Sequence, residues 1–197
     1  MFDSELGYRP RLGGETYSEQ GVLRNDYDDA KRPGVERILF IGDSVTRRGS
    51  IVRALRELYG EQAYEYWNGG VESFNTIQEV RYYLRYNRSI QPDHVVLTFH
   101  NNDFETTPAV FEHEGRLVVY EPTRRLSEVN PWLLRHSRSY QTWLARPTRG
   151  GHGRIVEETA ASLVELKRVL DSDSVRFTVL LLPLLAPVEE GMPGSPQ

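Results

Sequence analysis

The sequence of 197 residues contains no cysteine, and this absence removes several kinds of chemistry at once. Without cysteine the chain can form no disulfide framework, bind no metal through thiolate and use no thiol nucleophile. A basic stripe of the kind that binds nucleic acid is also missing, because the 24 Lys and Arg residues and the 28 Asp and Glu residues are spread along the chain. The sequence therefore predicts no nucleic-acid partner, and it indicates that any catalysis uses oxygen chemistry.

Long apolar runs are missing as well. No segment approaches the roughly 18 apolar residues that a membrane-spanning helix requires, and Met1 is followed by a polar stretch instead of a basic and then apolar leader. As written, the sequence predicts a soluble chain with no membrane segment or signal peptide, and it leaves the native compartment and the oligomeric state open. The length and the apolar content of 39% predict a single domain with one sizeable core.

What is present is an alternation of short apolar runs and amphipathic segments, which begins after residue 34. Residues 1–34 are rich in Gly, Pro, Arg, Asp and Tyr without a sustained period, so we expect an irregular arm that Tyr17, Val22 and Leu23 could pin to the surface. We expect residues 35–197 to form the domain. Apolar runs predict strands at residues 37–41, 63–67, 94–99 and 175–182. Helices predicted between them imply a parallel sheet that is covered on both faces.

The helices and one insertion are predicted in more detail. A helix after Ser44 should bury Ile51, Leu55 and Leu58 and end at Gly60. The spacing of apolar residues predicts further amphipathic helices at residues 77–84 and 155–170, and residues 131–144 should form one helix that starts at a proline. Residues 110–120 predict a small hairpin within an insertion at about residues 104–130.

Three predicted strands end in unusual polar or glycine-rich turns, which are Gly42-Asp-Ser44, Asn68-Gly-Gly70 and His100-Asn-Asn-Asp103. Ligands of doubly wound sheets bind at the carboxyl ends of the strands, so these turns should converge on one site. Ser44 precedes a helix, where free backbone N–H groups can stabilise a negative oxygen, and the amide of Asn102 could donate to it. Each turn alone has a plainer interpretation, as a helix cap, a tight turn or a solvated loop. Their occurrence in order after three separate strands favours a site.

Together, Ile41-Gly-Asp-Ser44, Asn68-Gly-Gly-Val-Glu-Ser-Phe-Asn-Thr76 and His100-Asn-Asn-Asp103 resemble the first three conserved blocks of the SGNH (GDSL-type) hydrolases. The resemblance implies an α/β fold, specifically a three-layer α/β/α flavodoxin-like fold with a parallel sheet, in which Ser44 attacks an ester carbonyl. It implies an oxyanion hole made of the Ser44 N–H, a backbone N–H at Ser73 and the side chain of Asn102. Asp43 and His100 are further pocket candidates. This chemistry requires neither a cofactor nor a metal.

The sequence departs from the family pattern in three places. Ser73 stands where the second block usually has Gly, and His100 replaces the Gly that opens the third block. The Asp-x-x-His block that carries the acid and base of the family is absent, since the last Asp is Asp173 and the last His is His152. We therefore expect a domain that is incomplete at its C-terminus, with an unprotected sheet edge. The remaining histidines, His94, His113, His136 and His152, are interpreted as solvated or locally hydrogen-bonded.

Two functions remain open from the sequence. The first is a serine esterase or acylhydrolase acting on carboxylic esters of small molecules or carbohydrates, with O-acetyl groups among the candidate substrates. The second is an inactive truncated or non-catalytic member that binds an acylated ligand or has no independent function. A serine hydroxyl is a weak nucleophile without a neighbouring base, so the missing acid and base favour the second. The presence of Ser44 and Asn102 favours the first.

Overall fold

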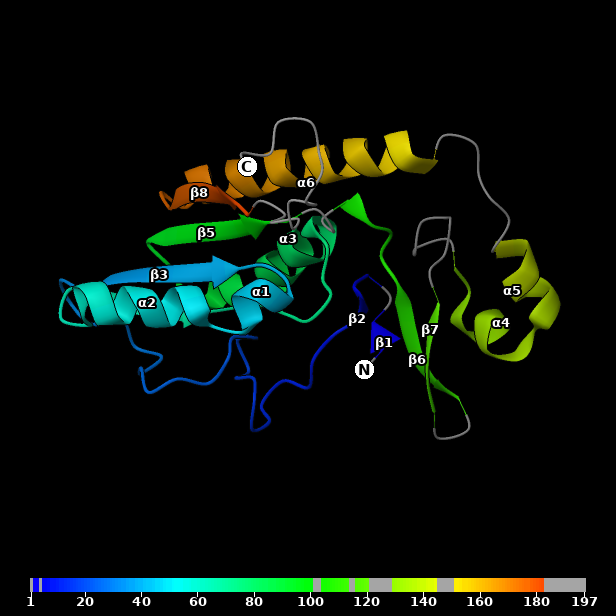
Figure 1. Cartoon of the computed structure of the whole chain (residues 1–197), viewed down its shortest axis with the longest axis horizontal. Coiled ribbons are helices and arrows are strands. Elements are labelled where there is room, and N and C mark those ends of the chain that lie inside the picture. Colours follow the sequence, from blue (N-terminus) through cyan, green and yellow to red (C-terminus); the bar gives the residue numbers. More distant parts are fainter. Residues whose placement is uncertain are drawn as a thin grey trace, which may run out of the picture.

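The computed structural model describes residues 2–3, 5–100, 104–113, 116–120, 129–144 and 151–182. Its centre is a four-stranded sheet with the strand order β4-β3-β5-β8. The strands are β3 (Glu36–Ile41), β4 (Tyr64–Asn68), β5 (His94–Phe99) and β8 (Arg176–Leu181). All neighbouring pairs are parallel, and Figure 1 shows the arrows of β3 and β5 pointing the same way. After β3 the chain adds β4 beside it at one edge of the sheet, and then adds β5 and β8 in order on the other side of β3. This is the flavodoxin-like winding that the family resemblance implies.

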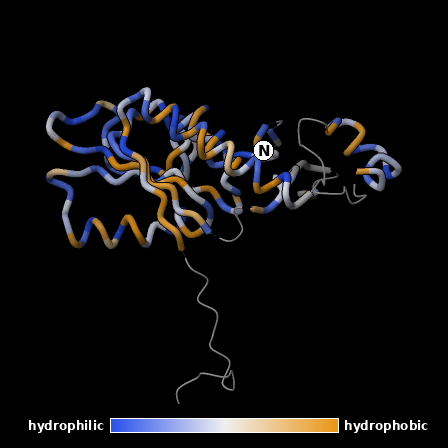
Figure 2. Tube along the Cα trace, turned by 90° about the horizontal axis from the view of Figure 1, so that it is seen from above, coloured by the Kyte–Doolittle hydropathy of each residue, from blue (hydrophilic) through white to orange (hydrophobic). Residues whose placement is uncertain are grey.

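Helices cover both faces of this sheet. On one face, α2 (Ser50–Tyr59) packs against a cluster that contains Phe40, Tyr66 and Val96. On the other face, α3 (Thr76–Arg85) and α6 (Gly151–Ser172) pack on Leu39 and Leu97. Consecutive residues of one strand, such as Leu39 and Phe40, thus enter opposite cores, as the pleat requires. The three-layer α/β/α arrangement is confirmed, and Figure 2 shows hydrophobic stretches concentrated where the strands lie together.

Two details of the predicted helices are wrong. Leu58 is 73% exposed because the last turn of α2 is not covered: Tyr59 beside it is also 66% exposed, and the buried residue of the helix is Val52 in its first turn. The helix expected over residues 131–144 is two helices, α4 (Pro131–His136) and α5 (Arg138–Leu144). Ser137 separates them because its backbone is extended, with φ −126° and ψ 107°.

The N-terminal arm is tied closely to the turn that follows β4. It contains two strands of two residues each, β1 (Phe2–Asp3) and β2 (Gly7–Tyr8), which pair antiparallel. Tyr17 and Val22 are only 5% and 1% exposed, and the Tyr17 hydroxyl donates to the Gly70 carbonyl at 2.9 Å. The arm is therefore part of the packing beneath this turn, while the division into residues 1–34 and 35–197 stays a prediction.

The segment between β5 and α6 contains the expected hairpin. Strand β6 (Ala109–His113) pairs antiparallel with β7 (Arg116–Tyr120). Figure 1 shows this hairpin, with α4 and α5, beyond the ends toward which the arrows of β3 and β5 point. The insertion thus lies at the carboxyl end of the sheet, where the candidate site is expected.

Strand β8 forms one border of the described sheet. Within the described residues β8 pairs with β5 alone, and Val179, Leu180 and Leu181 are 40%, 37% and 70% exposed. The strand therefore presents apolar side chains at an edge that carries no neighbouring strand among these residues. None of the helices in the described part of the chain is both long and apolar enough to cross a membrane.

Candidate active site

The candidate site lies where the winding of the sheet reverses. Because β3 is followed on one side by β4 and on the other by β5, a crevice is expected between the carboxyl ends of β3 and β5. Ser44 is the first residue of α1 (Ser44–Arg47), directly beyond β3. The buried hydroxyls of Thr46 and Thr98 hydrogen-bond to each other between α1 and β5. This bond ties the helix that begins at Ser44 to the neighbouring strand β5.

The turn that carries Ser44 is shaped by the two residues before it. A Cβ on Gly42 would overlap the hydroxyl oxygens of both Thr46 and Thr98, so only glycine fits there. The Asp43 carboxylate accepts a hydrogen bond from the Val45 N–H at 2.8 Å and caps α1. The cap, which was the plainer interpretation of this motif, is thus present together with a serine placed at a helix N-terminus.

The second turn packs directly on the first. The Val71 N–H donates to the Gly42 carbonyl at 3.0 Å, and the side-chain amide of Asn68 donates to the Thr46 carbonyl at 2.7 Å. A Cβ on Gly70 would come within 2.9 Å of the Thr46 carbonyl carbon, so a larger residue would push the two turns apart. The turns after β3 and β4 therefore converge as the sequence predicts.

Ser73 has the backbone conformation that glycine usually supplies. Its φ is 56°, in the left-handed region, which costs a non-glycine residue on the order of 1 kcal/mol or more. The backbone N–H groups of Ser73 and Ser44 donate to no other residue within the described part of the chain. The Ser44 hydroxyl likewise has no hydrogen bond there. No described residue therefore competes with a ligand for these two N–H groups.

The third turn is described only at its two ends. Asn102 lies outside the described residues, so its predicted role in the oxyanion hole stays a prediction, and His100 is half-buried at the carboxyl end of β5. Beyond the gap, the Asn75 side chain donates to the Glu105 carbonyl at 2.9 Å, and Phe104 packs edge-on against Phe99 with ring centroids 5.3 Å apart. These contacts hold the far end of the third turn beside the second.

Asn75 also begins α3, and sequence reasoning missed this role. Its side chain accepts a hydrogen bond from the Gln78 N–H at 3.0 Å, and the Gln78 side chain accepts one from the Asn75 N–H at 3.1 Å. This reciprocal pair is a capping box, with amide side chains at the N-cap and three residues later. The Asn-x-x-Gln spacing before an apolar run was the signal that could have found it.

Two of the described histidines, His94 and His136, lie outside the three turns of the candidate site. His94 lies at the amino end of β5, where its Nε2 is 2.9 Å from the Thr178 hydroxyl and burial lowers its pKa. His136 is exposed on α4, with its ring 5.2 Å from that of Trp132. The side chains of His113 and His152 lie outside the described residues. Among the described side chains, no group of three His, Asp or Glu residues is placed to hold a metal ion.

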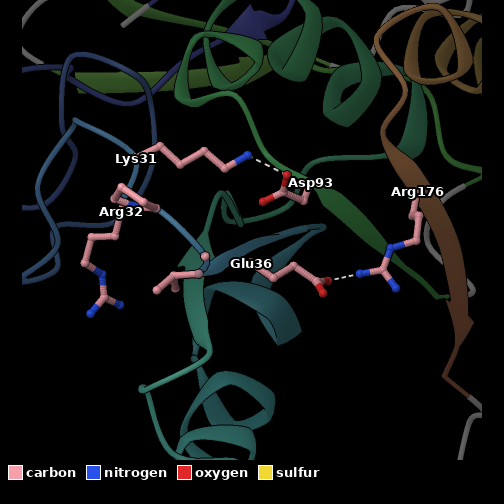
Figure 3. A pocket seen from close by; sticks show the side chains of 8 residues that line it. Lys31, Arg32, Glu36, Asp93 and Arg176 are labelled. Atoms are coloured by element: carbon pink, nitrogen blue, oxygen red, sulfur yellow. Dashed lines mark hydrogen bonds and ion pairs between the residues drawn. The ribbon is translucent and has the colours of Figure 1, made fainter.

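A charged hollow lies at the opposite end of the sheet (Figure 3). Its charges are paired, with Lys31 Nζ 2.5 Å from Asp93 and with Arg176 bound to Glu36. Burial acts to raise the pKa of Asp93, but the hydrogen bond from the Arg37 N–H and the Lys31 ammonium outweigh it and lower that pKa. Because these residues adjoin the amino ends of β3, β5 and β8, the hollow is separate from the Ser44 turn.

Comparison with known proteins gives structural similarities only. No protein-family model and no curated protein matches the sequence. The chain is similar to the solved acetyl xylan esterase AlAXEase, with 14% identity, coverage of 73% of this chain and 56% of that chain, and a TM-score of 0.42. It is similar to a variant of the acetyl xylan esterase Axe2 from Geobacillus stearothermophilus (13% identity, 72% and 75% coverage, TM-score 0.32) and to a GDSL-like lipase from Bacteroides thetaiotaomicron (11%, 73% and 68%, 0.31). The chain thus spans little more than half the length of AlAXEase.

Proposed function

We propose that the turn after β3 is the nucleophile and oxyanion site of a serine hydrolase that cleaves carboxylic esters. The observation that carries the proposal is the hydrogen bond from the Val71 N–H to the Gly42 carbonyl at 3.0 Å. It fixes the turns of Ser44 and Ser73 against each other while the N–H groups of both serines remain unused by the described residues. Two such donors on adjoining turns, one of which carries the Ser44 hydroxyl, suit a developing negative oxygen.

The chemistry assigned to these residues is acyl transfer. The Ser44 oxygen attacks the ester carbonyl carbon, the carbonyl oxygen becomes negative, and the N–H groups of Ser44 and Ser73 with the Asn102 amide stabilise it. The proton of the Ser44 hydroxyl ends on the leaving alcohol, and water then cleaves the acyl-serine, which yields a carboxylic acid and restores the Ser44 hydroxyl. Loss of one oxyanion donor typically lowers kcat about 100- to 1,000-fold. Small-molecule esters and O-acetyl groups on carbohydrates are the proposed substrates.

A second candidate is a non-catalytic protein that binds an acylated ligand at the same turn. Its support is that the Ser44 hydroxyl has no hydrogen bond to a described residue and that the chain contains no Asp-x-x-His block. A nucleophilic serine depends on its base so strongly that loss of the base costs nearly as much as loss of the whole catalytic set. This candidate predicts binding of an acetylated ligand without turnover.

The test is hydrolysis of a short-chain aryl acetate by the full chain and by Ser44→Ala. Ser50→Ala is the matched control, because Ser50 is an exposed serine at the start of the next helix. We expect turnover that is lost in Ser44→Ala and kept in Ser50→Ala, and a fluorophosphonate should add its mass to the wild type but not to Ser44→Ala. Turnover that persists in Ser44→Ala would exclude Ser44 as the nucleophile. Binding without turnover or labelling would establish the second candidate.

A further inference from the structure

The peptide group between Glu72 and Ser73 is held from the side opposite its N–H. The Tyr8 hydroxyl, in the N-terminal arm, donates a 2.5 Å hydrogen bond to the Glu72 carbonyl. The structure contains no cis peptide bond among the described residues, so the Glu72 carbonyl and the Ser73 N–H point in opposite directions from one planar unit. Tyr8 therefore contacts the same peptide group that offers its N–H to the proposed oxyanion.

We propose that Tyr8 is a positioning residue for the oxyanion hole, which orients and polarises the Glu72–Ser73 peptide so that the Ser73 N–H becomes a better donor. This inference rests on the function proposed above. A hydrogen bond accepted by a carbonyl strengthens the donor at the other end of the same peptide by about 10–30% in condensed-phase estimates. The bond also opposes rotation of a peptide whose next residue is already in the left-handed region.

The arm is anchored firmly enough for this role. The Leu6 carbonyl accepts a hydrogen bond from the Gln78 side chain at 2.6 Å, and Leu6 is fully buried. The Tyr8 ring packs edge-on against Phe74, with centroids 5.2 Å apart. Burial, with a smaller effect of the Glu72 carboxylate, raises the pKa of Tyr8, so the hydroxyl stays protonated and able to donate throughout the neutral pH range. Residues 6–8 are thus fixed on α3 and on the turn that carries Ser73.

Tyr17 provides a matched control for a purely structural role. Its hydroxyl also extends from the arm to a carbonyl of the same turn, that of Gly70, at 2.9 Å. The N–H of that peptide belongs to Val71 and is already used in the bond to Gly42 at 3.0 Å, so it cannot serve an oxyanion. Tyr8→Phe and Tyr17→Phe therefore remove the same group from the same arm, and only Tyr8→Phe should affect the reaction.

The kinetic test compares these two variants with the wild type on an aryl acetate. If polarisation accounts for about 10–30% of the logarithm of a donor's roughly 100- to 1,000-fold effect, Tyr8→Phe should lower kcat about 1.6- to 8-fold. We expect KM to stay within about twofold, because the oxyanion develops only in the transition state. Tyr17→Phe should keep the wild-type kcat. Equal losses in the two variants would overturn the inference and leave only anchoring of the arm.

A spectroscopic measurement decides the matter even without turnover. Loss of the Tyr8 hydroxyl should shift the carbonyl ¹³C signal of Glu72 and the amide ¹⁵N signal of Ser73, whereas Tyr17→Phe should leave both near their wild-type positions. If Ser44→Ala abolishes turnover but Tyr8→Phe changes neither kcat nor these signals, the inference about Tyr8 fails alone. If the wild type has no Ser44-dependent turnover, the proposed function fails. In that case the proposed role of Tyr8 in catalysis is refuted as well. The NMR signals of Glu72 and Ser73 still show whether Tyr8 is hydrogen-bonded to their peptide group.

Discussion

Replacement of Arg37, a buried residue of β3, should strongly lower the free energy of unfolding. Its side chain is 1% exposed on β3, where Nε lies 2.8 Å from the Glu65 carboxylate and Nη1 donates to the Ile90 carbonyl at 2.5 Å. The guanidinium also lies 4.6 Å from the centre of the Trp67 ring. Arg37→Met keeps most of the side-chain length but leaves the Glu65 charge, itself 1% exposed, with fewer donors.

The expected cost follows from this geometry. Breaking a buried pair by removing one partner costs about 3–5 kcal/mol, and Glu65 would retain only the Arg32 and Trp67 donors, at 2.7 and 3.1 Å. At about 2–4 °C per kcal/mol for a chain of this size, Tm should fall roughly 6–20 °C. Urea unfolding followed by circular dichroism measures the change. The double variant Arg37→Met/Glu65→Gln should recover part of the loss, because the unpaired charge is removed. A loss below about 1 kcal/mol in Arg37→Met would refute the reasoning.

Three further changes test the edge, the strained turn and the acid response. Leu181→Lys, at a side chain that is 70% exposed, should reduce aggregation in light scattering and change the stability by no more than about 0.5 kcal/mol; an unchanged aggregation rate would contradict this. Ser73→Gly should leave stability equal or higher by up to about 1 kcal/mol, because relief of the left-handed strain offsets the greater chain entropy of glycine, and a clear loss in urea unfolding would argue against strain at this residue. Burial acts to raise the pKa of Glu65 and of Asp93, but hydrogen bonds outweigh it, from Arg32, Trp67 and Arg37 to Glu65 and from the Arg37 N–H and Lys31 to Asp93, so both pKa values lie below their usual values. The stability that these carboxylates contribute is complete above their unfolded-state pKa values, near 4, and is lost as the pH falls through their folded-state pKa values. The urea midpoint should therefore be level from about pH 7 to 5 and should fall below about pH 4. The variant Glu65→Gln should weaken this fall.

The sequence was sufficient for the sheet because its signals there are local. The strand predicted at residues 94–99 matches β5 (His94–Phe99), whose apolar run is bounded by Pro92 and Asp93 on one side and by a polar turn on the other. The parallel pairing of the strands followed from their alternation with helices, whereas their order β4-β3-β5-β8 comes from the structure. The proximity of the turns of Ser44 and Ser73 followed in turn, since parallel strands end at the same edge.

Other features depend on contacts that no local pattern contains. Leu58 has helical spacing with Ile51, yet it lies in the exposed last turn of α2. Ser137 ends one helix and begins another without a glycine or proline to mark the break. The partners of Tyr8 in the turn and of Arg37 in the core come from segments distant in the sequence. These assignments require the three-dimensional packing.

The attachment of the arm to the second turn has a consequence for the order of folding. The bond between Tyr8 and Glu72 closes a loop across 64 residues, and that between Tyr17 and Gly70 closes one across 53. Such closures carry an entropy cost that is repaid only after the strands between them have paired. The N-terminal arm would thus be among the last segments to reach its native contacts. During refolding, native sheet signals should therefore appear before the Ser73 turn acquires the geometry on which the proposed chemistry depends.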